Sequence, residues 1–467
     1  MEATKVDKMR REKDSIGELD VPADAYWGIN TQRAILNFRI SGRTFSPEFI
    51  HSLAQIKKAC LFANRAAKLI SDEIGTAIVT AIDEVLEGKF DDQFPIDVFQ
   101  TGSGTQTNMN MNEVLSNRAN EILGHPRGEK SPVHPNNTVN MSQSSNDIIP
   151  TAMHLAAVKA LEKLLLPSLG RLRTTLSEKI KQFHSIVKVG RTHLQDAVPI
   201  SLSTEFQVYK EQVESAIKKD LSLAKETLLL IPIGGTALGT GLNTPKDFAK
   251  KATDELRKMT GFEFQINPVK AEGISSHNAI VRTSAALRSL ALTCMKMAND
   301  IRWMGSGPRA GLGELVLPQN EPGSSIMPGK VNPTQSEALI QVCLQVIGND
   351  TTIAAAEGFG SILDLNVTKP LMIINLLDSI NILAGGIESF ITNCLQGLDV
   401  NLARIDKQLE QSLMTVTRLA PLIGYDKAAD LAKKAHATGR TIREVVIESG
   451  ITIDGDLDEI LDPRKMV

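Results

Sequence analysis

The stretch TQSEALIQVCLQVIGNDTTIAAAE, residues 334–357, decides the fold class, because its apolar residues recur at helical spacing without a proline. Helices of about 25–30 residues are about 40–45 Å long, and several such helices joined by short connections form a bundle. Aromatic residues make up only 4% of the chain, while Ala, Leu and Ile dominate. The sequence therefore predicts an all-α protein with an elongated bundle of long central helices. The other long helical segments are expected over residues 147–183, 203–230, 276–304 and 370–395.

Local sequence features add detail to this bundle. Asp147 is expected to cap the first long helix with Pro150 in its first turn, and Pro167 is expected to kink it. The glycine-rich stretch IGGTALGTG, residues 233–241, follows a helix rather than a strand, so we predict a turn between helices instead of a dinucleotide loop. Smaller helices are predicted on both flanks of the bundle. The predicted domains are residues 1–143 (N-terminal, mostly helical), 144–397 (central long-helix bundle) and 398–467 (small C-terminal helical domain).

The composition limits the classes of partner. The net charge of the 467 residues is −3 and no basic stripe occurs, which argues against nucleic acid. We see no apolar run close to the roughly 20 residues that span a bilayer, and no secretory or transit signal, so we expect a cytoplasmic protein without membrane contact. The wide apolar faces of the long helices predict burial by other copies of the chain. The four cysteines have no C-x-x-C spacing and are predicted to be reduced core thiols.

Four polar segments stand at the boundaries of the predicted long helices. Hydroxyls, amides and helix N-termini together favour the binding of carboxylates. Each segment also has a structural interpretation, as helix caps, a core histidine, a surface loop or a linker. No pair of histidines has metal-ligand spacing and no G-x-S-x-G motif occurs, so neither a zinc site nor an acyl-transfer hydrolase is expected. The segments are QTGSGTQTNMN (100–110), HPNNTVNMSQSSND (134–147), GRTHLQDA (190–197) and GSSIMPGKVN (323–332).

Together these segments resemble the three signature regions of the fumarase/aspartase superfamily, and the likeness to class II fumarases runs from about Arg11 to the C-terminus. GSSIMPGKVNPTQSEA is highly specific to that group. Three flanking stretches are also similar to fumarases, namely PADAYWGINTQRA (22–34), IRWMGSGPRAGLGELVLPQNEPG (301–323) and IGYDKAADLAKKAH (423–436).

The resemblance implies a hydro-lyase that interconverts fumarate and (S)-malate by anti addition and elimination of water, through a carbanion stabilised by the neighbouring carboxylate. It implies no cofactor, no metal, and a homotetramer whose active sites are shared between subunits. Aspartate ammonia-lyase is the alternative, and a catalytically silent structural member is a further one. Fumarase is preferred because the chain has Gln-Thr-Gly-Ser-Gly-Thr-Gln and Ser-Ser-Asn-Asp where aspartases tend to show Ala-Gly-Thr-Ser and Ser-Thr-Asn-Asp.

Residue roles follow from the same matching. Ser324 is implied to be the base that removes the C3 proton. His193, oriented by Glu337, is implied to act on the water at C2. Lys330 and Asn332 are implied to hold the carboxylate that carries the developing charge. The other implied substrate-binding residues are Ser103, Gly104, Thr105, Ser144, Ser145, Asn146, Thr192, Ser325 and Val331.

One segment departs from the family pattern. Fumarases usually carry His-Pro-Asn-Asp in a loop that forms a second, peripheral carboxylate site. This chain has His134, Pro135, Asn136 and Asn137 there, and its nearest upstream cation in that loop is Lys130 rather than an arginine. The resemblance therefore implies a second site of altered charge.

Overall fold

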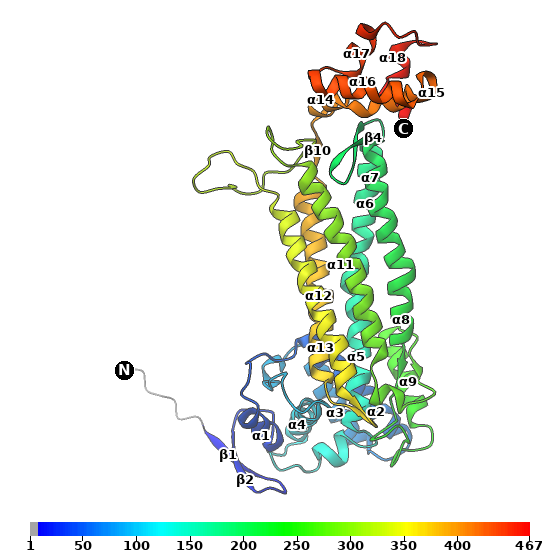
Figure 1. Cartoon of the computed structure of the whole chain (residues 1–467). Coiled ribbons are helices and arrows are strands. Elements are labelled where there is room, and N and C mark those ends of the chain that lie inside the picture. The colour runs from blue at the N-terminus through cyan, green and yellow to red at the C-terminus, as the bar shows by residue number, and fades with distance from the viewer. Residues whose placement is uncertain (1–7) are drawn as a thin grey trace. The chain divides into compact units, whose positions relative to one another are not determined.

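The computed structural model describes residues 8–467 and confirms the all-α prediction, with 18 α-helices and only short two-stranded sheets in that range (Figure 1). The described chain forms two compact units. Unit 1 contains the residues up to Leu165, Lys219–Arg288 and Gln345–Ile382. Unit 2 contains Leu166–Lys218, Ser289–Leu344 and Leu383–Val467. The division into domains 1–143, 144–397 and 398–467 stays a prediction.

Unit 1 is organised around α2 (Pro47–Ala66), which packs against α3, α5 and α9. Twelve residues of α2 are buried, among them the polar Lys57 and Asn64. The other elements of this unit are β1 (Met9–Lys13), β2 (Glu18–Pro22), α1 (Ile29–Asn37), α3 (Asp72–Leu86), η1 (Asp91–Gln93), α4 (Thr105–Ile122), η2 (Pro135–Val139), α5 (Ser145–Ala160), η3 (Leu161–Leu165), α8 (Ser222–Leu228), β5 (Leu230–Ile231), α9 (Phe248–Thr260), β6 (Gln265–Ile266), α10 (Glu272–Ser275), β8 (Ser361–Ile362) and β9 (Leu365–Asn366).

Unit 2 combines helices with an antiparallel hairpin of β3 (Val187–Thr192) and β4 (Gln195–Ser201). Residues 413–461 form a separate small apolar core. The remaining elements of this unit are α6 (Leu166–Gln182), α7 (Leu202–Ser215), β7 (Leu315–Val316), η5 (Ile391–Leu395), β10 (Asp399–Val400), α14 (Leu402–Gln411), η6 (Leu413–Arg418), α15 (Ala420–Ile423), α16 (Tyr425–Thr438), α17 (Ile442–Ser449), α18 (Leu457–Ile460) and η7 (Pro463–Met466). Both units contain parts of η4 (Ala216–Leu221), α11 (Asn278–Met304), α12 (Thr334–Gly360) and α13 (Lys369–Phe390).

The long helical segments fall where the sequence predicts them, but three of them contain a π-helical turn, namely η3, η4 and η5. The predicted helix over 147–183 consists of α5, the π-helical η3 and α6, and the wider turn comes directly before Pro167, whose missing N–H would break an α-helical ladder. Two local predictions are wrong. Ser144, not Asp147, is the N-cap of α5, and Asp147 is the third helical residue of a capping box, which puts Pro150 in the second turn.

Two apolar helices, Thr334–Gly360 and Lys369–Leu395, are by length and hydropathy alone able to cross a membrane, in contrast to the prediction that no apolar run approaches that length. Core helices of soluble proteins pass the same test. Polar residues in the middle of these helices contact one another, since the Asn349 side chain donates to Asp378 Oδ2 at 3.1 Å and to Ser379 Oγ at 3.0 Å. A buried amide needs hydrogen-bond partners, and in this helix pair the neighbouring helix supplies them. All four cysteines are free and buried, as predicted.

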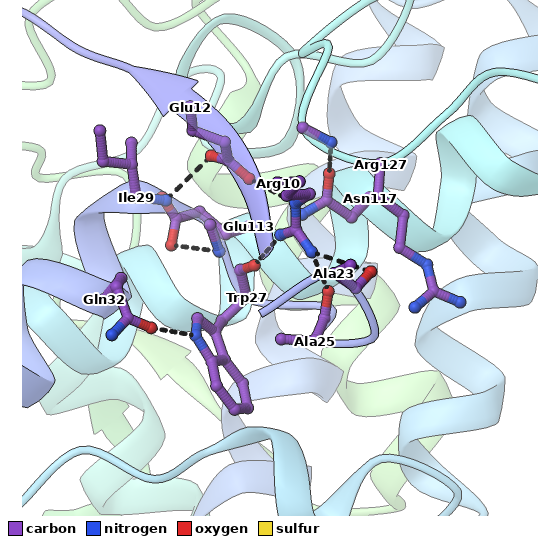
Figure 2. Close-up of polar contacts among 12 residues, drawn as sticks. Arg10, Glu12, Ala23, Ala25, Trp27, Ile29, Gln32, Glu113, Asn117 and Arg127 are labelled. Atoms are coloured by element: carbon purple, nitrogen blue, oxygen red, sulfur yellow. Dashed lines mark hydrogen bonds and ion pairs between the residues drawn. The ribbon is translucent and has the colours of Figure 1, made fainter. Parts of the chain in front are cut away.

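The segment around PADAYWGINTQRA is fixed to unit 1 by buried charges (Figure 2). Arg10 donates to the carbonyls of Pro22 and Ala25, each at 2.7 Å, and forms an ion pair with Glu12 at 2.8 Å. Glu113 on α4 accepts from the backbone N–H groups of residues 28, 30 and 31 at 2.9–3.0 Å. The carboxylates of Glu12 and Glu113 thus both accept from backbone N–H groups at the start of α1, where free N–H groups favour negative charge.

Candidate active site

Three of the predicted substrate-binding hydroxyls meet in unit 1. Thr105 Oγ1 lies 2.7 Å from Ser103 Oγ and 2.9 Å from Ser145 Oγ, so the three form a continuous hydrogen-bonded chain. Thr105 is the first residue of α4 and Ser145 is the first residue of α5. Two helix N-termini therefore converge on three hydroxyls. Two of the O–H groups are used within the chain, and the third can donate to a carboxylate that the positive helix ends favour.

Glycines shape the loop that carries Ser103. Gly104 caps α4 with a φ of +74°, a conformation that side chains rarely adopt. Gly102 lies directly against the backbone of Val367, and its carbonyl accepts from the N–H of Lys369 at 3.0 Å. The loop is thus held by backbone contact with the start of α13, more than 260 positions later in the chain. The Lys369 ammonium is itself buried and donates to the carbonyl of Asn366 at 2.8 Å.

The second predicted segment, Ser144–Asn146, is anchored through Asp147. One Asp147 oxygen accepts from the N–H of Ser144 at 2.9 Å, and the other accepts from the N–H groups of Gly234 and Thr236 at 2.9 and 3.0 Å. Burial raises the pKa of Asp147 to about 7, although these three donors oppose the rise. The side chain of Asn146 donates to Ala237 O at 2.9 Å.

The stretch at 233–241 contains no helix and leads to α9, as predicted for a turn, but it follows the two-residue strand β5 and not a helix, so that part of the prediction is wrong. It also holds the predicted Ser144–Asn146 segment through its bonds to Asp147, a long-range contact that the sequence does not indicate.

The predicted second carboxylate site forms a short π-helical turn, η2, with His134 as its N-cap. His134 Nδ1 accepts from the backbone N–H groups of Asn136 and Asn137 at 3.0 and 3.2 Å, which leaves the other ring nitrogen as the one that carries a proton. Burial and Lys130 lower the pKa of His134, so the ring is neutral near pH 7. Pro135 is buried, and Asn136 and Asn137 are exposed.

In unit 2 the loop over residues 323–332 is closed by its own backbone. Gly323 donates to Lys330 O at 3.1 Å, Lys330 donates to Met327 O at 3.2 Å, and the side chain of Asn332 donates back to Gly323 O. Ser324 Oγ accepts from the N–H groups of Ile326 and Met327 at 3.2 and 3.1 Å. Two backbone donors that point at one hydroxyl oxygen stabilise negative charge on it.

A cavity of about 340 Å³ borders this loop and is lined by Ser324 and Lys330. Ser324 is half-buried, whereas Ser325, Lys330 and Val331 are exposed. The loop thus presents its cation and its hydroxyl to solvent, where a small anion can reach both.

His193 stands in the two-residue turn of the β3–β4 hairpin, directly after Thr192. His193 and Leu194 both have positive φ values, +56° and +60°, which is the pattern of a type I′ turn. Neither residue is a glycine or an asparagine, so the backbone is strained here, and such strain concentrates at functional sites. The hairpin was not predicted from the sequence.

Buried charges support this hairpin from within unit 2. Arg191 forms an ion pair with Glu314 at 2.6 Å, and Lys188 contacts Glu314 and Glu205 at 3.3 and 3.0 Å. Glu314 is fully buried and Lys188 nearly so. The network fixes the strand that leads into the turn. Its members were not among the predicted site residues, because they can be recognised only once the fold shows that these distant residues form ion pairs.

The predicted residues thus form separate groups. Ser103, Thr105 and Ser145 meet in unit 1, while Ser324, Lys330 and Asn332 share one loop of unit 2. Glu337 lies in the first turn of α12. Within the described residues of one chain, no hydrogen bond joins His193 to Glu337 or to Ser324. Residues 8–467 contain no group of three His, Cys, Asp or Glu side chains that could hold a metal ion.

Comparisons with known proteins match nearly the whole chain. A family model described as Lyase matches residues 17–348, and one described as Fumarase C C-terminus matches residues 416–467. A class II fumarate hydratase of Nitrosomonas europaea is 50% identical over 461 residues, or 99% of each chain. The mitochondrial fumarate hydratase of Saccharomyces cerevisiae is 50% identical over 98% of this chain and 94% of its own. The crystal structure of a class II fumarase from Schistosoma mansoni superimposes with a TM-score of 0.95 at 39% identity, covering 98% of this chain and 99% of the other.

Proposed function

The chain belongs to the class II fumarase family, and we propose that it interconverts fumarate and (S)-malate by anti addition and elimination of water. The observation that carries this proposal is the chain of hydroxyls from Ser103 through Thr105 to Ser145 at two helix N-termini. Its donors suit a carboxylate, and fumarate and malate each carry two. Hydration transfers no electrons, so the reaction itself calls for no redox cofactor.

Ser324 is the proposed base that removes the C3 proton of malate. A hydroxyl is a weak base, and the reaction requires that its negative form be stabilised. The N–H groups of Ile326 and Met327 donate to its oxygen and supply part of that stabilisation. Lys330 follows in the same loop and adds a positive charge to the site.

The carbanion formed by this step places charge on the adjacent carboxylate. Lys330 and Asn332 are proposed to hold that carboxylate, with Ser325 and Val331 beside them. Binding that strengthens as the charge develops accelerates the chemical step. The contact of Asn332 with Gly323 supports this role, because it fixes the amide at the base of the loop.

His193 is proposed to act on the water at C2, with Glu337 as its orienting carboxylate and Thr192 as a substrate ligand. The strained turn supports a functional role for His193, since a residue better suited to the turn would otherwise be expected. Ser144, Asn146 and Gly104 complete the proposed substrate pocket, and residues 134–137 the proposed second carboxylate site.

A homotetramer with active sites shared between subunits is part of the proposal. Within one chain only 33% of the most apolar 18-residue stretch of α12 is buried. Phe359 and Leu363, near the end of this helix, are 85% and 91% exposed. Apolar helix faces of this kind call for burial by another chain. Sharing of sites between subunits also accounts for the missing contact between His193 and Glu337 within one chain.

A cytoplasmic location is proposed as well, and fractionation of the source cells tests it.

The direct test is the ultraviolet absorbance of fumarate after mixing with the purified protein, with and without ammonia. We expect the absorbance to fall in water alone as the double bond is hydrated, and malate to appear in equal amount. A loss of fumarate that requires ammonia would assign the chain to the aspartate ammonia-lyases. No loss under either condition would favour a silent structural protein.

A further inference from the structure

Lys57 is a buried cation without a carboxylate partner. It lies on α2 and is 1% exposed. Its ammonium donates to Asn140 Oδ1 at 3.0 Å and to Gln143 Oε1 at 2.9 Å, and both acceptors are neutral amides. Among the described residues it forms no ion pair. Buried charges are ordinarily paired because desolvation is costly, so an unpaired one calls for an explanation.

The two acceptors belong to the turn that leads from η2 to the substrate segment. Gln143 directly precedes Ser144 and donates to the carbonyls of Val139 and Met141, each at 3.0 Å. Asn64 lies two turns beyond Lys57 on the same face of α2, and its amide donates to Met141 O at 2.9 Å. The polar face of α2 therefore holds the whole turn over 139–143.

Few ionisable groups act on the Lys57 ammonium. Burial lowers the pKa of Lys57 to about 7, and the groups that raise it are Cys60 and Asp147. Burial also raises the pKa of the Cys60 thiol, which is therefore neutral at physiological pH. Burial raises the pKa of Asp147 to about 7, so this carboxyl is only partly ionised near neutral pH and compensates Lys57 incompletely.

We propose that Lys57 is a positioning residue for substrate binding. It holds the Ser144–Asn146 segment through Asn140 and Gln143, and its positive charge makes this segment receptive to a carboxylate. The bound substrate is then the anion that compensates the buried ammonium. This inference rests on the proposed function, since it concerns the same carboxylate.

The first test replaces Lys57 by methionine, which keeps the length and the apolar stem. At an effective dielectric constant of about 20, one unit charge about 12 Å from a bound anion changes the affinity for that anion by roughly tenfold. We expect KM for fumarate, and the calorimetric Kd for the unreactive dicarboxylate succinate, to rise about tenfold. The kcat value should change much less, because Lys57 does not touch the reacting atoms.

Lys159→Met is the matched control. Lys159 lies on α5 in the same unit, its pKa is lowered by burial as well, and it also donates to a neutral amide, Gln55 Oε1, at 3.2 Å. It is more than three helical turns from Ser144 along α5, so we expect succinate affinity to stay at the wild-type value. Circular dichroism and size-exclusion chromatography establish that each variant is folded and assembled.

A second variant separates charge from geometry and serves if Lys57→Met does not fold. Asn140→Asp keeps an oxygen that accepts from Lys57 but supplies the missing negative charge. We expect a similar loss of succinate affinity. In the wild type, succinate affinity should also fall as the pH rises through about 7, because Lys57 loses its proton, and Lys57→Met should lack that part of the pH dependence.

Wild-type affinity for succinate in a folded Lys57→Met or Asn140→Asp variant would overturn the inference. Succinate binding is measured without turnover, so this result is distinguishable from a failure of the proposed reaction. That failure would appear as a wild-type protein that does not hydrate fumarate.

Discussion

Replacing Gly102 by alanine should damage the site without touching any group that reacts. The added methyl carbon would lie 2.7 Å from the Cα of Val367, and closer still to the carbonyl carbon and oxygen of that residue. Cβ atoms are essentially never found within 3.0 Å of such neighbours, and the obstacle here is backbone, which cannot rotate away as a side chain could. The loop of Gly102 and the segment of Val367 must therefore separate.

The added carbon would lie 1.4 Å from the Val367 carbonyl oxygen and must move to beyond 3.0 Å from it. The shift next to Ser103 therefore exceeds 1 Å, and a misplacement of about 1 Å can already cost about 100-fold in rate. We expect kcat/KM for fumarate to fall by about two orders of magnitude. The forced separation should also lower the free energy of unfolding by about 1–3 kcal/mol, the usual cost of overpacking. Steady-state hydration followed by fumarate absorbance gives the first quantity, and denaturant unfolding gives the second.

Gly170→Ala supplies the control, because Gly170 lies inside α6 and a Cβ there meets nothing within 4 Å. That change should leave kcat/KM unaltered and raise helix stability by about 0.5–1 kcal/mol. A Gly102→Ala enzyme with kcat/KM within threefold of wild type would refute the reasoning, and so would an equal loss of activity in both variants.

Ser324→Ala should lower kcat by about 100-fold or more while KM for fumarate changes little, because general-base catalysis contributes at least that much; unchanged kcat would remove Ser324 from the base role. Inactive His193→Asn and Ser324→Ala proteins, unfolded together and refolded as a mixture, should recover about one quarter of the sites if assembly is random and sites are shared, and mixed tetramers without activity would contradict this. Asn137→Asp should change the response of the rate to added dicarboxylates more than it changes kcat, and superimposable effector curves would make that loop structural. Glu113→Gln should lower the free energy of unfolding by about 1–3 kcal/mol, because the N–H₂ group that replaces one carboxylate oxygen would face a backbone N–H without an acceptor between them. An unshifted denaturation midpoint would argue against that contact.

The long helices were predictable because their apolar residues recur at helical spacing over many turns. The predicted segments 334–357 and 276–304 correspond to Thr334–Gly360 and Asn278–Met304. The π-helical turns η3, η4 and η5 within the long segments were not predictable, since one extra residue shifts the apolar pattern by less than a turn of helix. The β3–β4 hairpin was missed because its turn is His-Leu instead of the Asn-Gly pair typical of such turns.

The chemistry of the candidate site came from the resemblance of short motifs, and its support could not be read from the sequence. Gly102 meets Val367, and Asp147 meets Gly234, only because the fold brings segments far apart in the chain together. Lys57 looks like one more polar residue of an amphipathic helix until its two amide partners are known. Periodicity reports which face of a helix is buried, but it does not report which buried residue meets which.

The turn at His193 and Leu194 has a consequence for attempts to make this protein more heat-resistant. Both residues adopt a backbone conformation that costs side chains of their kind about 1–3 kcal/mol each. A mutant library selected only for survival at high temperature should therefore accumulate glycine and asparagine in this turn and lose the imidazole with it. The same library selected for hydration of fumarate should keep His193 and gain its heat resistance from substitutions at other positions. With the role proposed for His193, stability and turnover compete for one position, and the chain has kept the less stable choice.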